Sequence, residues 1–134
     1  MANEVVHFEI NGKNIDTLKA FYTGLFGWEA QDWPMPGGHP YVGFDTKEMG
    51  GIGGGLTVIP DGAPPMATCY ISVEDLAASL AAVEAAGGQT VVPITDVGMV
   101  VFALFADPQG NVVGLVKTGA IGPAEARELV AALG

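Results

Sequence analysis

Residues 67–88, ATCYISVEDLAASLAAVEAAGG, carry the pattern that decides the fold. Their first seven residues (67–73) are rich in β-branched and aromatic side chains, which is typical of a strand. Glu74 and Asp75 then place negative charge where the N-terminus of a helix favours it. Apolar residues recur at helical spacing until two glycines at 87–88 interrupt the pattern. The segment therefore predicts a strand followed by a helix.

The residues after this helix predict three further strands, at 89–94, 100–106 and 112–117. Residues 107–111, DPQGN, form a strong turn signal between the last two strands. The second half of the chain is thus expected to run strand, helix and three strands.

The first half of the chain predicts the same order of elements. Residues 5–10, VVHFEI, indicate a strand that is followed by an Asn-Gly turn. A helix is expected to begin at Asn14 or Asp16 and to stop at Gly27, because glycine tolerates the left-handed backbone at a helix end. Three short strands are expected next, at 28–32, 41–45 and 51–59.

The two halves therefore form an internal repeat, in which His7 and Thr68 hold corresponding positions at an offset of 61 residues. We expect an α+β fold in one domain over residues 1–134. Its expected parts, in chain order, are module one at about 4–59, a PDGAPP linker at 60–65, module two at about 66–118 and a short C-terminal helix at about 122–133.

Size and charge limit the class of protein. A chain of 134 residues has the length of one ordinary domain. Its residues are 49% hydrophobic and 15% charged, a composition that is too apolar for a disordered chain. The net charge of −10 would repel nucleic acid and anionic membranes. No stretch has the length of a membrane span or the order of a secretory signal, so a cytoplasmic location is expected.

Several motifs resemble the vicinal oxygen chelate superfamily, which includes glyoxalase I, the bleomycin-resistance proteins and the extradiol dioxygenases. The likeness is greatest to the small glyoxalase-related proteins. It implies two βαβββ modules that form a curved eight-stranded half-barrel sheet around a cavity. The matching motifs are HFEI at 7–10, AFYTGLFGW at 20–28, GGIGGGL at 50–56, YISVEDLAASLAAVEAAGG at 70–88 and FALFADPQGNVVGL at 102–115.

Metalloenzymes of that superfamily hold a divalent metal through the first and last strand of each module. The resemblance places His7 and Thr68 at the first-strand positions, and Gly55 and Gly114 at the last-strand positions. Only His7 is a good ligand, whereas even open catalytic sites usually keep about three protein ligands. We therefore expect no metal site and no other cofactor.

Side-chain alternation along the strands indicates which residues line the cavity. Phe8 and Ile10 suit the helix side of their strand, so His7 and Glu9 are expected to point to the cavity. The candidate ligand-binding residues of the strands are His7, Glu9, Thr68 and Tyr70, with Gly55 and Gly114 leaving space for a ligand.

A Pro/Gly-rich loop, PMPGGHPY at 34–41, supplies further candidates. Trp33, His39 and Tyr41 could form a lid over an apolar ligand, or the loop could pack its own apolar residues onto the sheet or a second subunit. The glycine run at 50–55 lacks the lysine of a phosphate-binding loop, so we expect it to permit close approach of a neighbour. Cys69, the single cysteine, is expected to face the core.

The leading functional hypothesis is a metal-independent protein that binds a small metabolite or antibiotic in the cavity. The alternative is a glyoxalase-like lyase, isomerase or dioxygenase, with His7 and Glu9 as a general acid–base pair or with a divalent metal held by unrecognised residues. Whether the protein is an enzyme stays open. The apolar stripe of the C-terminal helix (Ala126, Leu129, Val130, Leu133) favours a homodimer.

Overall fold

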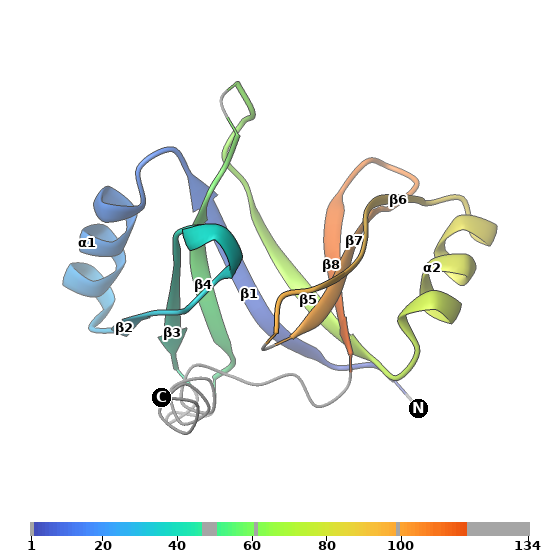
Figure 1. The fold of residues 1–134 in the computed structure, drawn as a ribbon, viewed down its shortest axis with the longest axis horizontal. Coiled ribbons are helices and arrows are strands. Elements are labelled where there is room, and N and C mark those ends of the chain that lie inside the picture. Colours follow the sequence, from blue (N-terminus) through green and yellow to red (C-terminus); the bar gives the residue numbers. More distant parts are fainter. Residues whose placement is uncertain (1, 47–50, 61, 99, 118–134) are drawn as a thin grey trace. The chain divides into compact units, whose positions relative to one another are not determined.

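The computed structural model of the protein describes residues 2–46, 51–60, 62–98 and 100–117. Two βαβββ series follow one another along the chain (Figure 1), which confirms the α+β class and the predicted order of elements. The first series is β1 (Val5–Gly12), α1 (Ile15–Phe26), β2 (Glu29–Asp32), the 3₁₀ turn η1 (Pro36–Gly38), β3 (Tyr41–Asp45) and β4 (Gly53–Val58). The second series is β5 (Ala67–Val73), α2 (Leu76–Ala85), β6 (Gln89–Asp96), β7 (Val101–Ala106) and β8 (Val112–Lys117). The predicted C-terminal helix lies outside the described residues.

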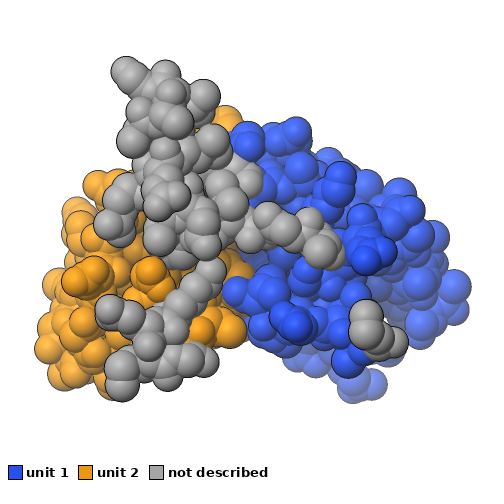
Figure 2. Space-filling view, turned by 90° about the horizontal axis from the view of Figure 1, so that it is seen from below, with its two compact units in different colours: residues 1–6, 68–120 blue, residues 7–67, 121–134 orange. Residues whose placement is uncertain are grey.

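The chain divides into two compact units, which Figure 2 shows in different colours. Among the described residues, unit 2 holds those between 7 and 67, and unit 1 holds those between 2 and 6 and between 68 and 117. The first residues of β1 belong to unit 1, and the rest of β1 belongs to unit 2. The expected domain boundaries stay a prediction. The predicted half-barrel with a cavity between the modules stays a prediction.

Each unit contains the same arrangement of four strands. In unit 2 the strand order is β2-β3-β4-β1, and in unit 1 it is β6-β7-β8-β5. The first and last strand of each series pair in parallel, β1 with β4 and β5 with β8, whereas the other pairs are antiparallel. The internal repeat in the sequence is therefore also a repeat of topology.

Side-chain caps define where the helices begin. The Asn14 Oδ1 atom accepts a hydrogen bond from the Thr17 backbone N–H at 3.0 Å, so Asn14 is the N-cap of α1. Asp75 caps α2 in the same way through the N–H of Ala78, at 2.9 Å. Gly27 ends α1 with a φ of 69°, the left-handed conformation for which glycine was expected there.

The first and sixth strands are longer than the sequence indicates, and β6 extends two residues further, to Asp96. β1 runs on through Asn11 and Gly12, which were expected to form a turn. The backbone N–H of Asn11 donates to the Met66 carbonyl at 3.0 Å, and the carbonyl of Gly12 accepts from Ile59 at 3.1 Å. Hydrogen bonds from segments distant in sequence thus outweigh the local turn preference of Asn-Gly.

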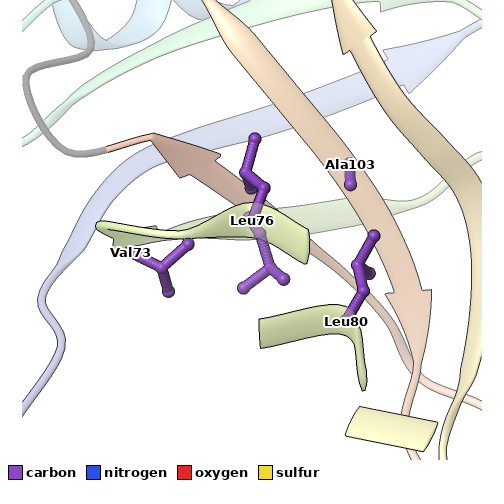
Figure 3. Packing of buried hydrophobic residues seen from close by; sticks show 5 residues of the cluster. Val73, Leu76, Leu80 and Ala103 are labelled. Atoms are coloured by element: carbon purple, nitrogen blue, oxygen red, sulfur yellow. The ribbon is translucent and has the colours of Figure 1, made fainter. Parts of the chain in front are cut away.

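Helix packing gives each unit its own hydrophobic core. In unit 2 the buried side chains of Val42, Phe44 and Leu56 pack with residues of β1 and α1. In unit 1, Leu76 and Leu80 of α2 pack on the strands (Figure 3). The buried members of the unit 1 core are Val73, Leu76, Leu80, Ala103 and Leu115. Neither described helix is long and apolar enough to span a membrane.

The turn between β7 and β8 is organised by Asp107. Its Oδ1 atom accepts from the backbone N–H groups of Gln109 at 2.8 Å and Asn111 at 2.9 Å, and Oδ2 accepts from the Asn111 side-chain amide at 2.8 Å. These bonds favour the charged carboxylate, and the bond from the Asn111 side chain contributes most to lowering the pKa of Asp107.

We expect Asp107→Asn to make the stability of the protein less sensitive to acid. A carboxyl whose folded-state pKa lies below its ordinary value of 3.8 adds stability above that value and loses it as the pH falls through the lower folded-state pKa. Urea unfolding at stepped acidic pH should therefore show a steeper loss for the wild type than for the variant below about pH 4. Equal pH dependence of the two proteins would contradict the assignment.

Candidate functional site

An aromatic cluster occupies the face of the unit 2 strands that is opposite α1. It consists of His7 on β1, Tyr41 on β3 and Trp33 just after β2. The His7 Nε2 atom lies 2.8 Å from the Tyr41 hydroxyl oxygen, within hydrogen-bond distance. The ring centroids of Trp33 and Tyr41 are 5.1 Å apart, and those of His7 and Trp33 are 5.8 Å apart. We call these three residues the His7–Tyr41–Trp33 cluster.

Strand alternation correctly assigned the faces of β1. Phe8 and Ile10 pack into the core beneath α1, so His7 and Glu9 point to the other face. Glu9 is half-buried and stands in register with Gly55 of β4. The partner that the structure gives His7, Tyr41, lies 34 residues away in sequence and was not assigned as its partner from the sequence.

Glycine is required beneath the rings of the cluster. A Cβ atom placed on Gly43 would lie 2.0 Å from Trp33 Nε1, and one placed on Gly55 would lie 2.3 Å from Tyr41 Cε1. Both distances are far below van der Waals contact, so any side chain at these positions would displace a ring. Within the glycine run, Gly55 is thus explained by the ring of Tyr41, and Gly54 is explained in the same way by the ring of Phe8.

Unit 1 carries the corresponding arrangement on β5 and β8. Tyr70 is buried and stands opposite Gly114, where an added Cβ would lie 2.2 Å from Tyr70 Cδ2. The Tyr70 ring makes an edge contact with Phe102 at a centroid distance of 6.2 Å. The Thr68 hydroxyl donates to the Val112 carbonyl at 2.6 Å.

These contacts correct the expectation that Gly55 and Gly114 leave open space for a ligand. Tyr41 fills the space above Gly55, and Tyr70 fills the space above Gly114. The sequence shows a missing side chain at both glycines, but it does not show which ring from a neighbouring strand takes its place. The assignment of Gly55, Gly114, Thr68 and Tyr70 to ligand binding stays a prediction.

The loop before β3 packs on its own sheet. Trp33 and Tyr41 are each only 8% exposed, and the Trp33 backbone N–H donates to the Tyr41 carbonyl at 2.9 Å. These contacts match the second of the two expectations, in which the loop's aromatic residues pack onto the strands. Trp33 Nε1 is buried and has no hydrogen-bond partner among the described residues. This atom lies against the backbone of Gly43, so its N–H is closed off from solvent by the packing of the ring.

His39 is exposed, and its Nε2 atom lies 2.9 Å from the Thr57 hydroxyl oxygen, within hydrogen-bond distance. The same hydroxyl lies 3.1 Å from the Pro40 carbonyl, which can accept its proton. These contacts link His39 to β4.

Asn11 is a buried polar residue that the sequence did not single out. Its Oδ1 atom accepts from the Met66 backbone N–H at 2.8 Å, while its own N–H donates to the Met66 carbonyl. The two bonds hold the residue before β5 against β1. Its position two residues after Glu9, on the same face, is the only sequence signal that could have indicated it.

The residues present do not fit the metal arrangement that the resemblance implies. No group of three His, Cys, Asp or Glu side chains within the described ranges could hold a metal ion. A carboxylate at position 55 would need the space of the Tyr41 ring, and His7 Nε2 is already hydrogen-bonded to the Tyr41 hydroxyl. Cys69 in unit 1 is half-buried and is not a member of such a group.

The sequence comparisons identify the family. The family model of the Glyoxalase/Bleomycin resistance protein/Dioxygenase superfamily matches residues 4–115. The chain belongs to this superfamily. It is 37% identical over 101 residues to "Putative glyoxylase CFP32" of Mycobacterium bovis, covering 72% of this chain and 39% of that protein. It is 30% identical over 132 residues to anthracycline biosynthesis protein DnrV of Streptomyces peucetius, covering 88% of this chain and 48% of that protein.

The chain spans less than half of the length of these curated relatives. Solved structures share its fold at low sequence identity. A hypothetical protein, BH1468 from Bacillus halodurans, matches 91% of the chain and 99% of its own length with a TM-score of 0.69 and 14% identity. Methylmalonyl-CoA epimerase of Streptomyces coelicolor, solved with 2-nitronate-propionyl-CoA, matches with the same coverage, a TM-score of 0.64 and 16% identity.

We expect Gly55→Ala to displace the Tyr41 ring and to break its hydrogen bond to His7. The overlap should lower the free energy of unfolding by about 1–3 kcal/mol, the usual cost of overpacking. Urea unfolding measures the loss of stability, and the ¹⁵N resonance of His7 Nε2 reports the hydrogen bond, with Tyr41→Phe as the reference for its absence.

The matched control is the same substitution in a Tyr41→Ala background. There Gly55→Ala should cost little, because the ring that it would strike is gone. An equal cost in both backgrounds would show that Tyr41 is not the neighbour that requires glycine at position 55.

Proposed function

We propose that this superfamily member binds a small, partly apolar metabolite or antibiotic at the His7–Tyr41–Trp33 cluster without using a metal. The observation that carries the proposal is the position of the Tyr41 ring. It fills the space above Gly55, where the superfamily's metalloenzymes would carry a metal-binding side chain, and its hydroxyl is hydrogen-bonded to His7, the one good candidate metal ligand. A tyrosine in this position supports recognition by packing and hydrogen bonding instead of coordination. We also propose the cytoplasm as its location, on composition alone.

The cluster indicates the chemistry of the ligand. The three aromatic rings favour a ligand with a flat apolar body. The hydroxyl and imidazole of the His7–Tyr41 pair can each donate or accept. A flat aromatic molecule with carbonyl oxygens meets these requirements, and the name of the anthracycline biosynthesis relative is consistent with a ligand of that class.

An enzyme is the second candidate, and the 2.8 Å contact between His7 and Tyr41 favours it. A hydrogen-bonded imidazole and phenol can move a proton to or from a bound molecule, which is the requirement for an acid–base lyase or isomerase. Glu9, on the same face of β1, remains a proposed further acid–base group. A dioxygenase, or a lyase or isomerase that uses a metal, would need a set of metal ligands, and the described residues do not supply one.

We expect the purified full chain to hold far less than one equivalent of metal and to bind a hydroxyanthraquinone probe equally well before and after chelation. Tyr41→Phe should weaken binding about tenfold or more, because it removes the hydroxyl of the His7–Tyr41 pair. Calorimetric titration measures the affinity, and Val91→Ala, at an exposed position of β6, is the control.

Two results would overturn the binding proposal. One is about one metal per chain that is lost in His7→Ala. The other is an exchange experiment, in which the protein is incubated in deuterated water with a panel of small carbonyl compounds. If the wild type introduces deuterium at a carbon next to a carbonyl group, and both His7→Gln and Tyr41→Phe abolish this exchange, the protein is an acid–base enzyme.

A further inference from the structure

The C-terminal segment, residues 118–134, follows the last described residue, Lys117. Its sequence predicts an amphipathic helix at about 122–133, whose apolar stripe consists of Ala126, Leu129, Val130 and Leu133. Arg127 precedes Val130 by three residues, so it stands at the border of that stripe. It is the only arginine in a chain with 15 carboxylate side chains. The predicted helix therefore offers an apolar face with one cation at its border.

The face of the unit 2 strands that carries the His7–Tyr41–Trp33 cluster has complementary features. We call it the cluster face; it also carries Glu9, and α1 packs on the opposite side of the strands. Trp33 and Tyr41 are each only 8% exposed, although α1, the one α-helix in the described part of unit 2, does not lie on them. A sheet buries one of its faces by packing a further layer on it. We therefore expect a part of the chain other than α1 to cover the cluster face.

We propose that the predicted C-terminal helix docks on the cluster face of its own chain, with its apolar stripe on the aromatic rings and with Arg127 at Glu9. Glu9 is half-buried and stands in register with Gly55, which the Tyr41 ring covers. A guanidinium group suits this position, because it pairs with a carboxylate and also stacks on aromatic rings. Charge and apolar surface thus favour the same segment as the occupant.

The C-terminal segment is long enough to reach the cluster face. β8 ends in register with the end of β5, and Ser72 of β5 donates its backbone N–H to the Glu4 carbonyl at 2.8 Å. The end of β8 thus lies two strand spacings, or about 10 Å, from Glu4. Glu4 precedes His7 by three residues, which is at most about 10 Å of chain. Residues 118–121 can bridge about 13 Å and the predicted helix is about 18 Å long, so the segment exceeds the distance that it must cover.

Docking of the helix on the cluster face closes the proposed ligand site. This consequence rests on the proposed function, whereas the docking itself does not. A ligand must displace the helix to reach the cluster, so the docked fraction of the molecules lowers the apparent affinity of the site. The C-terminal segment is then an autoinhibitory element of the same chain.

Hydrogen exchange of the full chain tests the docking directly. The backbone amides of residues 125–133 should exchange at least about tenfold more slowly than in a synthetic peptide of residues 118–134, because an isolated helix of that length is marginal in water. The protection should be equal at about 1 µM and about 100 µM protein, because the helix docks on its own chain. Exchange as fast as in the peptide, or protection that appears only at the higher concentration, would overturn the proposal.

Leu129→Gln tests the apolar stripe. It should remove most of the protection of residues 125–133, because it places an amide group where the helix meets the aromatic rings. Ala131→Gln lies two residues further along, on the other side of the same helix, and is the matched control that should exchange like the wild type. Equal loss of protection in both variants would overturn docking through this stripe.

A charge exchange tests the contact between Arg127 and Glu9. Arg127→Glu and Glu9→Arg should each speed exchange about fivefold or more, and the double variant should regain most of the protection, because the two charges attract each other again. Glu9→Arg combined with Lys13→Glu, at an exposed lysine, has the same net charge and should not regain it. Recovery in both double variants, or in neither, would overturn the assigned contact.

Titration with the hydroxyanthraquinone probe separates autoinhibition from the proposed function. Leu129→Gln should bind the probe about tenfold more tightly than the wild type, because its helix no longer competes for the cluster, and Ala131→Gln should bind like the wild type. If the probe binds to none of these proteins, the proposed function is wrong, and hydrogen exchange still decides the docking. A protected helix in the wild type with equal probe affinity in Leu129→Gln would overturn the autoinhibition.

Discussion

Aromatic rings that pack against glycines are the interaction on which the rest of unit 2 depends. Tyr41 covers Gly55 on one face of β4, and Phe8 covers the adjacent Gly54 on the other face. Because successive residues of a strand point to opposite faces, two neighbouring glycines let rings approach both sides of the same strand. The ring on one face completes the core beneath α1, and the ring on the other face builds the candidate site. Stability and the candidate site thus depend on the same short glycine run.

This arrangement changes what the superfamily's fold can do in this chain. A carboxylate on a last strand would compete with Tyr41 or Tyr70 for the same space, so the metal arrangement and the ring-on-glycine packing exclude each other. His7 is retained, but its Nε2 atom is bonded to a phenol hydroxyl. A histidine that would bind a metal in one member of the superfamily can form a hydrogen bond instead in another member, without any change in the order of strands. The fold alone therefore does not determine the chemistry.

Ring-on-glycine packing is a feature of the strands and not of the helix surface. Gly54, Gly55 and Gly114 each carry a ring from a neighbouring strand, whereas Gly24 of α1 carries none within the described residues.

The amino-acid sequence by itself determined the order of elements, the helix caps and the faces of the strands, because these depend on residues close together in the chain. Asn14, Gly27 and the alternation around His7 are of this kind. The tertiary structure alone decided that His7 bonds Tyr41, that rings fill the space above Gly55 and Gly114, and that β1 continues through Asn11. Each of these contacts joins segments from different strands, and its geometry depends on register and ring orientation, for which the local sequence carries no signal.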